Sequence, residues 1–512
     1  MAITKVIGAM LGNYTGGSAD DTVVVGDGAG DAITTGVDNT LIGDNAGTAL
    51  TEGSNNVAIG NEALASNTTG SRNVAIGYAS LDAATTAVNN TAVGNSSMSA
   101  NTSGTSNAAF GRNAMLANTT GDNNTAVGMS ALDANTTADH NTAVGKDALG
   151  ANTTGASNTA VGSGALDANT TANNNTAIGQ AALTTNTTGA SNTAVGTNAL
   201  YANTTASNNT AVGLSALEVN TTGDALTAVG KDSMKTNTTG RFNCALGYES
   251  LALNTTGGNN VAIGKGALYA NTTASNNTAI GYGALTTNTT SSNSAALGYQ
   301  VLNVATGAGN TGGGASALEA CSTGANNTAL GYAAGYQLTT GSNNLFLGTE
   351  AGRTGSPGGA VTTASNEICL GDENISAANV QVAWSVASDK RDKTDVAPIK
   401  TGLDFVNKLE PVTYRWDKRS KYGDKHANDY DLNAQTPDGT HKEDWLDVGF
   451  LAQDVEKLEA EYGYIMKDNT NLATHLNDDG KQYHLKYTKF IPSLVKAIQE
   501  LSAELNELKD SK

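Results

Sequence analysis

Residues 124–137 read NTAVGMSALDANTT, and this stretch decides the fold. Its glycine, Gly128, recurs at a constant spacing, as at Gly111 and Gly145, without a slip from Gly26 to Gly298. After one spacing that is a single residue shorter, the period resumes from Gly314 to Gly348. A fixed period of this length is typical of a solenoid, in which each repeat forms one coil and stacks on its neighbours. The sequence therefore predicts a mainly β protein with a parallel β-solenoid of 17-residue coils over residues 26–298.

Each coil is predicted to contain a short strand just before its glycine. Thr125 stands three residues before Gly128 and Val127 stands one residue before it, and other coils carry Val, Thr, Ile, Leu or Phe at these places. Residues two apart on a strand point to the same face, and β-branched residues favour strands. We expect this face to be the buried one. The glycine is expected to provide a positive φ or a close backbone approach at a corner.

The second half of the coil carries an apolar anchor and an amide. Leu or Met stands four residues after every glycine from Gly60 to Gly298, as at Leu132. Asn and Thr follow at seven and eight residues, as at Asn135 and Thr136, and Ala84 and Ala305 are the exceptions at the Asn position. Stacked amides of this kind bond to the copies above and below. The coil should therefore consist of a strand, a corner, a second extended piece and a return turn.

The core of such a coil is thin. One Leu contributes about 2 to 3 kcal/mol on burial, whereas ordering costs roughly 1.5 kcal/mol for each residue of the coil. We therefore predict an obligate homotrimer, in which three chains bury the remaining small apolar faces against one another. About 19 coils at roughly 4.8 Å each would form a shaft on the order of 90 Å long.

Two of the predicted strands resemble a known coil signature. Residues 56–60 and 73–77 read NVAIG, which is similar to the head domains of trimeric autotransporters and to bacteriophage tail-fibre shafts. The resemblance implies parallel β-rolls wound by three chains. The period of this chain is longer than the usual autotransporter repeat, so a β-roll and a triangular β-helix both remain open.

The regular repeat has unlike segments at both ends. Residues 1–25 resemble the start of phage fibre proteins that dock on the virion. Residues 299–387 lose the strict pattern and gain Tyr332, Tyr336 and Phe346 together with the run GSPGG at 355–359. Exposed aromatic residues in a loosened repeat are expected at a distal, receptor-contacting tip. A cap that closes the solenoid would account for the same residues.

The composition changes near residue 388. Residues 1–387 hold 23 acidic and 9 basic residues, whereas residues 388–512 hold 24 and 19. Residues 388–512 are predicted to form a small α+β domain that ends in a coiled-coil helix at 489–510. Its a/d seam alternates spacings of three and four through Ile491, Leu494, Ile498, Leu501, Leu505 and Leu508. Such a short helix does not persist alone in water, so it indicates association.

Four blocks of this domain resemble the endosialidase-type intramolecular chaperone that ends many phage tail fibres and spikes. They are residues 388–393 (SDKRDK), 403–416, 449–456 (GFLAQDVE) and 487–492 (YTKFIP). The resemblance implies that the domain trimerises, templates the β-structured shaft and then cuts itself off. Carried over residue by residue, it implies a scissile bond between Ala387 and Ser388, with Ser388 as nucleophile and Lys393 as base.

The chemistry of this pair places demands on its surroundings. A serine hydroxyl is a poor nucleophile until a neighbour removes its proton, and a neutral lysine can do so. Lysine has an ordinary pKa near 10.4, so desolvation or a nearby cation must favour its neutral form. Lys390 and Arg391 are candidate cations, whereas Asp392 departs from the apolar residue that is usual in the family. A separation of five residues suits neither a helix face nor a strand face, so the pair must meet through a turn or across chains.

Composition excludes several function classes. A net charge of −19 without a basic block argues against binding nucleic acid or an anionic membrane. No apolar run approaches the roughly 18 residues of a membrane span or the core of a secretory signal. Cys244, Cys321 and Cys369 lack the spacing of a disulfide framework or a zinc site, so we expect plain buried or half-buried thiols. Neither a cofactor nor a metal site is implied.

The sequence thus predicts a structural and binding protein, a homotrimeric phage tail fibre that attaches the virion to a bacterial surface. Its partners would be a tail or baseplate protein at the N-terminus and a receptor that is a polysaccharide or an outer-membrane protein. Its only enzymatic activity would be one turnover of self-cleavage. A tailspike that degrades polysaccharide is an alternative, although the shaft acids Asp82, Asp133, Asp167 and Glu218 are scattered without a pair. A bacterial adhesin is a further alternative, disfavoured because no signal peptide or anchor is evident.

Overall fold

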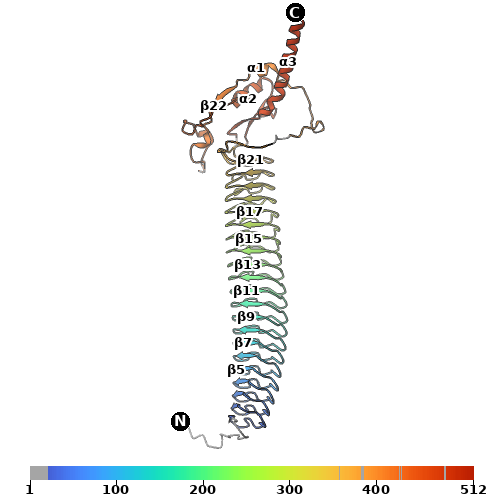
Figure 1. Ribbon diagram of the computed structural model, residues 1–512, viewed down its shortest axis with the longest axis vertical. Coiled ribbons are helices and arrows are strands. Elements are labelled where there is room, and N and C mark those ends of the chain that lie inside the picture. Colours follow the sequence, from blue (N-terminus) through green and yellow to red (C-terminus); the bar gives the residue numbers. More distant parts are fainter. Residues whose placement is uncertain are drawn as a thin grey trace. The chain divides into compact units, whose positions relative to one another are not determined.

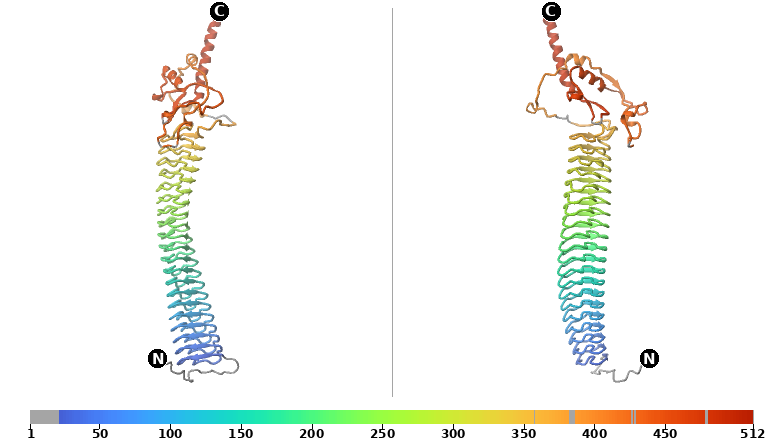
Figure 2. Two further views of the ribbon diagram at one scale, coloured as in Figure 1. Left: turned by 90° about the vertical axis from the view of Figure 1, so that its left-hand side faces the viewer. Right: turned by 180° about the vertical axis from the view of Figure 1, so that it is seen from behind.

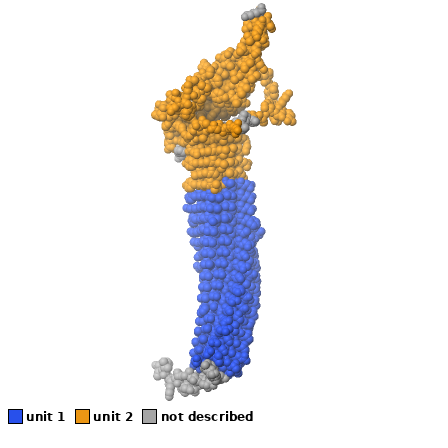
Figure 3. Space-filling model, in the orientation of Figure 1, with its two compact units in different colours: residues 1–295 blue, residues 296–512 orange. Residues whose placement is uncertain are grey.

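The computed structural model describes residues 21–356, 358–381, 386–425, 427, 429–477 and 480–511. The chain divides into two compact units, residues 1–295 and residues 296–512 (Figure 3). Most of the predicted attachment segment, residues 1–20, lies outside the described residues. Within the described ranges no helix has the length and apolar content that a membrane crossing requires.

The first unit is a stack of coils that each contribute one three-residue strand (Figures 1 and 2). Every strand pairs in parallel with the next, in a register of one coil, as Thr125 with Thr142 and Val127 with Val144. This confirms the predicted parallel solenoid. The strands are β1 (Val23–Val25), β2 (Thr40–Ile42), β3 (Val57–Ile59), β4 (Val74–Ile76), β5 (Thr91–Val93), β6 (Ala108–Phe110), β7 (Thr125–Val127), β8 (Thr142–Val144), β9 (Thr159–Val161), β10 (Thr176–Ile178), β11 (Thr193–Val195), β12 (Thr210–Val212), β13 (Thr227–Val229), β14 (Cys244–Leu246), β15 (Val261–Ile263) and β16 (Thr278–Ile280), with β17 (Ala295–Leu297) at the division between the units.

The buried face of each strand is the opposite of the one predicted. Ala126, the middle residue of β7, is fully buried, whereas Thr125 is half-buried and Val127 is 38% exposed. The interior of the coil already holds the Leu anchor and the Asn side chains, so it has room only for the alanine methyl group. The branched residues on either side of the alanine therefore point outward.

The apolar anchor and the Asn ladder are where the sequence predicts them. Leu132 is fully buried. The amide of Asn135 donates from Nδ2 to Oδ1 of Asn118 in the preceding coil at 2.7 Å. A second ladder, which the sequence pattern did not predict, runs through the Asn just before most strands, where the backbone N–H of Asn141 donates to Oδ1 of Asn124 at 2.9 Å. Two buried amide ladders therefore link most coils to the next, with interruptions such as Ala84 in the first and Leu226 in the second.

The second side of the coil is a chain of turns rather than the predicted extended piece. The residues two and four after each glycine have positive φ, as Asp147 (54°) and Leu149 (53°) do. As a result, successive N–H groups point alternately toward the two neighbouring coils. Asp147 donates back to the carbonyl of Met129, whereas Leu149 donates forward to the carbonyl of Ala165. Left-handed backbone costs a non-glycine residue about 1 to 2 kcal/mol, so the coils depend on stacking for this conformation.

The glycine at each corner meets both predicted requirements. Gly128 has a φ of +139°, and a Cβ added there would lie 2.4 Å from the carbonyl oxygen of Gly145. Glycine is required at this corner because no other residue fits both the conformation and the space.

The second unit contains four further strands of the same kind and a small α+β domain. The strands β18 (Thr311–Gly313), β19 (Thr328–Leu330), β20 (Leu345–Leu347) and β21 (Ile368–Leu370) pair in parallel, and the coil between β20 and β21 is longer than the others because Leu345 pairs with Ile368. The domain contains η1 (Lys390–Asp392), α1 (Leu403–Asn407), β22 (Val412–Tyr414), η2 (Arg419–Lys421), η3 (Leu432–Ala434), β23 (Asp447–Gly449), α2 (Ala452–Glu461), η4 (Met466–Asp468), β24 (Thr474–Leu476), β25 (Tyr483–Leu485), η5 (Tyr487–Lys489) and α3 (Phe490–Asp510).

The core of this domain lies where α1, α2 and the start of α3 meet. Phe405, Val455, Ala473 and Phe490 are buried together, with Val406 and other apolar residues packed around them. Glu459 of α2 is almost fully buried and accepts hydrogen bonds from the backbone N–H groups of residues 472–474. The domain is therefore held by contacts that occur once in the chain.

The predicted coiled-coil seam is present on α3 and is uncovered. Phe490, Ser493 and Ala497 face the domain. The seam residues Ile491, Leu494, Ile498, Leu501, Leu505 and Leu508 are between 43% and 64% exposed. This face packs on no described part of the chain.

Candidate functional site

A short turn brings the predicted nucleophile and base together. Ser388 and Lys393 flank η1, and the carboxylate of Asp389 caps this turn by accepting from the backbone N–H of Arg391 at 2.9 Å. The Nζ atom of Lys393 then lies 2.6 Å from Oγ of Ser388 and 3.2 Å from the carbonyl oxygen of Ser388. The turn therefore brings the two side chains together within one chain.

The charged residues of the turn are largely paired with one another. Arg391 donates to both carboxylate oxygens of Asp389, with Nη2 and Oδ2 2.6 Å apart. The hydrogen bonds from the Arg391 side chain and backbone lower the pKa of the Asp389 carboxyl group. Because Asp389 offsets the charge of Arg391, Lys390 is the better candidate for a cation that favours neutral Lys393.

The site is open to solvent in the single chain. Residues 386–393 are all exposed, and Val386 is 86% exposed. Asp392, which departs from the family pattern, is among these exposed residues. Neither desolvation nor a cover over Lys393 is therefore supplied by the described part of this chain, and a neighbouring chain would have to provide it.

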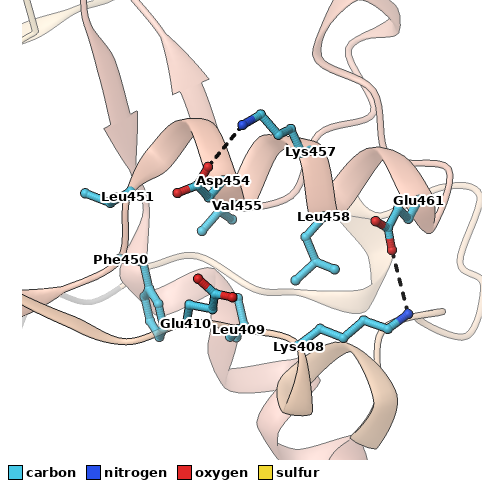
Figure 4. A pocket seen from close by; sticks show the side chains of 10 residues that line it. All are labelled: Lys408, Leu409, Glu410, Phe450, Leu451, Asp454, Val455, Lys457, Leu458 and Glu461. Carbon is cyan, nitrogen blue, oxygen red and sulfur yellow. Dashed lines mark hydrogen bonds and ion pairs between the residues drawn. The ribbon is translucent and has the colours of Figure 1, made fainter.

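A separate cleft of about 440 Å³ lies along α2 (Figure 4). Phe450, Leu451 and Leu458 line it together with Leu409, and the charged ends of Lys408 and Glu461 close one side of it through an ion pair at 3.6 Å. Asp454 also lines the cleft, whereas Gln453 does not. The lining includes neither Ser388 nor Lys393, so this cleft is not the cleavage site.

A buried ion cluster ties the two sides of the predicted scissile bond together. The ammonium of Lys425 lies 2.5 Å from Glu350 and 2.7 Å from Glu373, and Arg353 also pairs with Glu350. Burial lowers the pKa of Lys425, but the hydrogen bonds that its ammonium donates to Glu350 and Glu373 outweigh this effect, so the pKa is raised. Glu350, Asp372 and Glu373 lie close enough to hold a metal ion, but Lys425 already supplies the cation there. Glu350 and Glu373 precede residue 388 and Lys425 follows it, so the cluster bridges the bond.

Two expectations about the solenoid residues are corrected. Phe346 is fully buried rather than exposed, and Tyr336 lies beneath the guanidinium of Arg353 at 4.7 Å. Of the three aromatic residues, Tyr332 is therefore the open one, at 54% exposed.

The shaft acids are also not all isolated. A Cβ at Gly150 would lie 2.7 Å from Oδ1 of Asp167 and 3.6 Å from Oδ1 of Asp133. Residues two coils apart share one side of the solenoid, a proximity that a linear search for pairs misses.

The acid pair also has perturbed ionisation. Burial raises the pKa of the carboxyl groups of Asp133 and Asp167, and the negative charge of Asp147 adds to both shifts.

The cysteines behave as predicted. Cys321 and Cys369 are buried, Cys244 is half-buried and all three are free; burial raises the pKa of Cys321 and Cys369 to about 11.

The comparison with known families follows from this domain. Residues 388–464 match the family described as chaperone of endosialidase. The match begins at Ser388 and ends before the predicted block at residues 487–492. No curated protein and no solved structure matches the chain. The predicted resemblance is confirmed, and a parallel β-solenoid followed by this chaperone domain fits the architecture of a tail fibre or tailspike.

Proposed function

We propose that this chain is a homotrimeric bacteriophage tail fibre whose C-terminal domain aligns three chains and then cuts itself off before Ser388. The observation that carries the proposal is the 2.6 Å approach of Lys393 Nζ to Ser388 Oγ at the first residue of the family match. The parallel solenoid supplies the fibre shaft. The virion is the expected location, with the N-terminus docked on a tail or baseplate protein and a bacterial surface molecule as receptor.

The outward face of the strands supports trimer formation. The last residue of each strand from β1 to β16 is Val, Ile, Leu or Phe, although it is half-buried or exposed in the single chain, as Phe110 at 42% and Ile178 at 41% are. The residue just after the glycine, in contrast, varies freely and includes Asp44 and Lys146. A position that is outward-facing yet never polar is one that another surface covers. Only a second copy of this chain repeats with the same period over so many coils.

The chaperone domain provides a second, separate association surface. The seam of α3 exposes six apolar residues with heptad spacing, which is the pattern that pairs helices of neighbouring chains. Because this seam occurs once per chain, it can fix which coil of one chain faces which coil of the next.

The cut follows from the pair of side chains. Neutral Lys393 accepts the hydroxyl proton of Ser388 as Oγ attacks the carbonyl carbon of Ala387. The C–N bond to Ser388 breaks, its nitrogen takes the proton back from Lys393, and Ala387 is left as an ester on Oγ. Water then hydrolyses this ester to the Ala387 carboxylate, and Ser388 regains its hydroxyl beside a free amine.

Cutting is expected only after assembly. Lys393 is exposed to water in one chain, whereas the reaction requires a base from which water is excluded. Contacts with neighbouring chains would exclude that water and favour the neutral base. The cut would therefore report that the three chains have assembled.

The test is the intact mass of the expressed chain and three variants. We expect fragments that end at Ala387 and begin at Ser388, and we expect hydroxylamine to trap the ester at Ala387. Ser388→Ala and Lys393→Ala should leave one chain of 51.6 kDa that still forms trimers. Lys457→Ala, which removes an exposed lysine of α2, should still cut. Cutting by Lys393→Ala at the rate of the unchanged chain would overturn the assignment.

A tailspike enzyme is the second candidate, favoured by the proximity of Asp133 and Asp167. Two carboxyl groups near one point, with raised pKa values, are the elements of glycoside hydrolysis. Release of reducing sugar from host polysaccharide that is lost in Asp133→Asn and Asp167→Asn would favour it. The absence of release with the unchanged trimer would leave the fibre as a binding protein.

A further inference from the structure

Four consecutive coils of the first unit carry a ladder of lysine and tyrosine just after the corner glycine. The residues are Lys231, Tyr248, Lys265 and Tyr282. The ammonium of Lys265 lies 5.7 Å from the ring centroids of both Tyr248 and Tyr282, and that of Lys231 lies 5.6 Å from Tyr248. These are cation–π distances, so each ammonium is held beside the tyrosine rings.

The ladder concentrates features that are rare in the rest of the shaft. Residues 1–387 contain only nine lysines and arginines, and four of them lie between residues 231 and 265. The two rings are also open to solvent, since Tyr248 is 39% and Tyr282 is 48% exposed. The position just after the corner glycine carries charged residues in other coils, as at Asp44 and Lys146. We therefore expect this position to face solvent in the assembled fibre as well.

The charges around the ladder leave one cation available. Lys231 pairs with Asp232 at 3.6 Å, and Lys235 pairs with Asp232 and Glu218. Glu249 lies beside the hydroxyl of Tyr248. Lys265 forms no ion pair with the described residues, and its ammonium contacts the two tyrosine rings. The positive charge of Lys265 therefore lies between the two tyrosine rings, where solvent can reach it.

The spacing of the ladder matches a repeating ligand. Coils stack at the strand spacing, so Tyr248 and Tyr282 are about 10 Å apart along the solenoid, with Lys265 beside both rings. This spacing is comparable to the length of a disaccharide. Tyrosine rings pack against the apolar faces of sugar rings, while an ammonium pairs with a carboxylate. A polymer in which an acidic sugar alternates with a second sugar offers both groups at this interval.

We propose that Lys231, Tyr248, Lys265 and Tyr282 form a binding strip for an anionic polysaccharide that runs along the shaft. The proposal rests on the function of host attachment proposed above and names a ligand class and a surface for it. The strip lies on the side of the solenoid rather than in the predicted tip at residues 299–387.

The test uses the assembled trimer with hyaluronate, in which an acidic sugar alternates with a neutral one, as probe. Dextran and polyglutamate serve as the neutral-sugar and non-sugar controls. Binding is measured by calorimetry at low and high salt. We expect hyaluronate to bind and the affinity to fall with salt, because exposed charges are screened. The double variants Lys231→Gln with Lys265→Gln and Tyr248→Ser with Tyr282→Ser should each lose at least tenfold in affinity.

Matched controls exist at the same coil position. Lys146→Gln removes a lysine flanked by Met129 and Ser163, and Tyr78→Ser removes an exposed tyrosine flanked by Asn61 and Asn95. Both should keep the affinity. Equal losses in the controls, no binding by the unchanged trimer, or equal binding of dextran or polyglutamate would overturn the proposal. A trimer that is cut before Ser388 but does not bind the polysaccharide would contradict the binding strip alone. An uncut monomer would contradict the proposed function as a fibre.

Discussion

The coils of residues 26–295 and the domain that begins at Ser388 are stabilised by opposite kinds of contact. In the coils each bond is repeated, so the amide of Asn135 donates to Asn118 just as that of Asn169 donates to Asn152. In the domain each bond is unique, as between Thr401 and Ser493, whose hydroxyl oxygens lie 2.6 Å apart. A chain displaced by one coil would make nearly the same repeated contacts, whereas unique contacts tolerate no displacement. In the proposed trimer, the unique contacts of the domain would therefore set the alignment of the three chains.

The largest expected effect comes from removing the domain. Deletion of residues 388–512 should leave chains that pair out of register, and most of the protein should be found as aggregate after expression. Non-local pairing of thin coils is slow, and misaligned strands are prone to association. The measurement is the soluble, protease-resistant fraction. Recovery of a soluble, protease-resistant trimer from the truncated gene would show that the coils assemble in register without the domain.

A smaller but still large effect is expected at one corner glycine. Gly128→Ala drives a methyl group to 2.4 Å from the backbone of the next coil, so we expect a loss of more than about 3 kcal/mol because neither backbone can move away cheaply. The matched control is Gly164→Ala, where φ is +65° and no atom lies within 4 Å. It should cost only about 1 kcal/mol for the left-handed conformation. Thermal unfolding of both trimers gives the comparison, and equal losses would contradict the packing argument.

An equivalent pair of variants tests the unique contacts of the domain. Glu459→Ala leaves the N–H groups of residues 472–474 without their buried acceptor, and should cost about 3 kcal/mol. The control is Glu461→Ala, which changes an exposed glutamate of the same helix, α2, that pairs with Lys408. This variant should cost no more than about 1 kcal/mol. Denaturation of the uncut Ser388→Ala chain measures both. A Glu459→Ala domain as stable as the control would mean that its network contributes little.

The smallest effect distinguishes the two outward-facing positions of a coil. Val127 and Met129 are almost equally exposed in the single chain, at 38% and 37%. Val127→Glu would bring three like charges into the proposed interface and should lower the melting temperature of the trimer by several degrees, whereas Met129→Glu, between Arg112 and Lys146 of the neighbouring coils, should not lower it. Equal responses would show that the strand face is not the interface.

The sequence predicted which positions recur in each coil, but it did not predict the conformation or the buried face of all of them. Period, strand positions, the Leu anchor and one Asn ladder could all be predicted because each recurs in every coil. The buried face was predicted wrongly because branched residues that face outward, as the proposed interface between chains requires, have the same composition as a core. The turns at Asp147 and Leu149 were missed since leucine is rare at positive φ, although glycine at the equivalent Gly164 and Gly266 gives a signal for that conformation.

The residues of the proposed cleavage site could be named from the sequence, whereas their arrangement could not. Ser388 and Lys393 came from a resemblance, and the turn that joins them depends on the cap from Asp389. The ion cluster of Glu350, Glu373 and Lys425 was not predicted because its members lie far apart in the sequence. No local pattern marks residues that meet only after the chain has folded.

Native mass spectrometry of freshly expressed protein tests the account most directly, because it reports chain number and cutting together. The account predicts assemblies built on three copies of residues 1–387, with a fragment whose first residue is Ser388. A folded, uncut single chain of 51.6 kDa would contradict it.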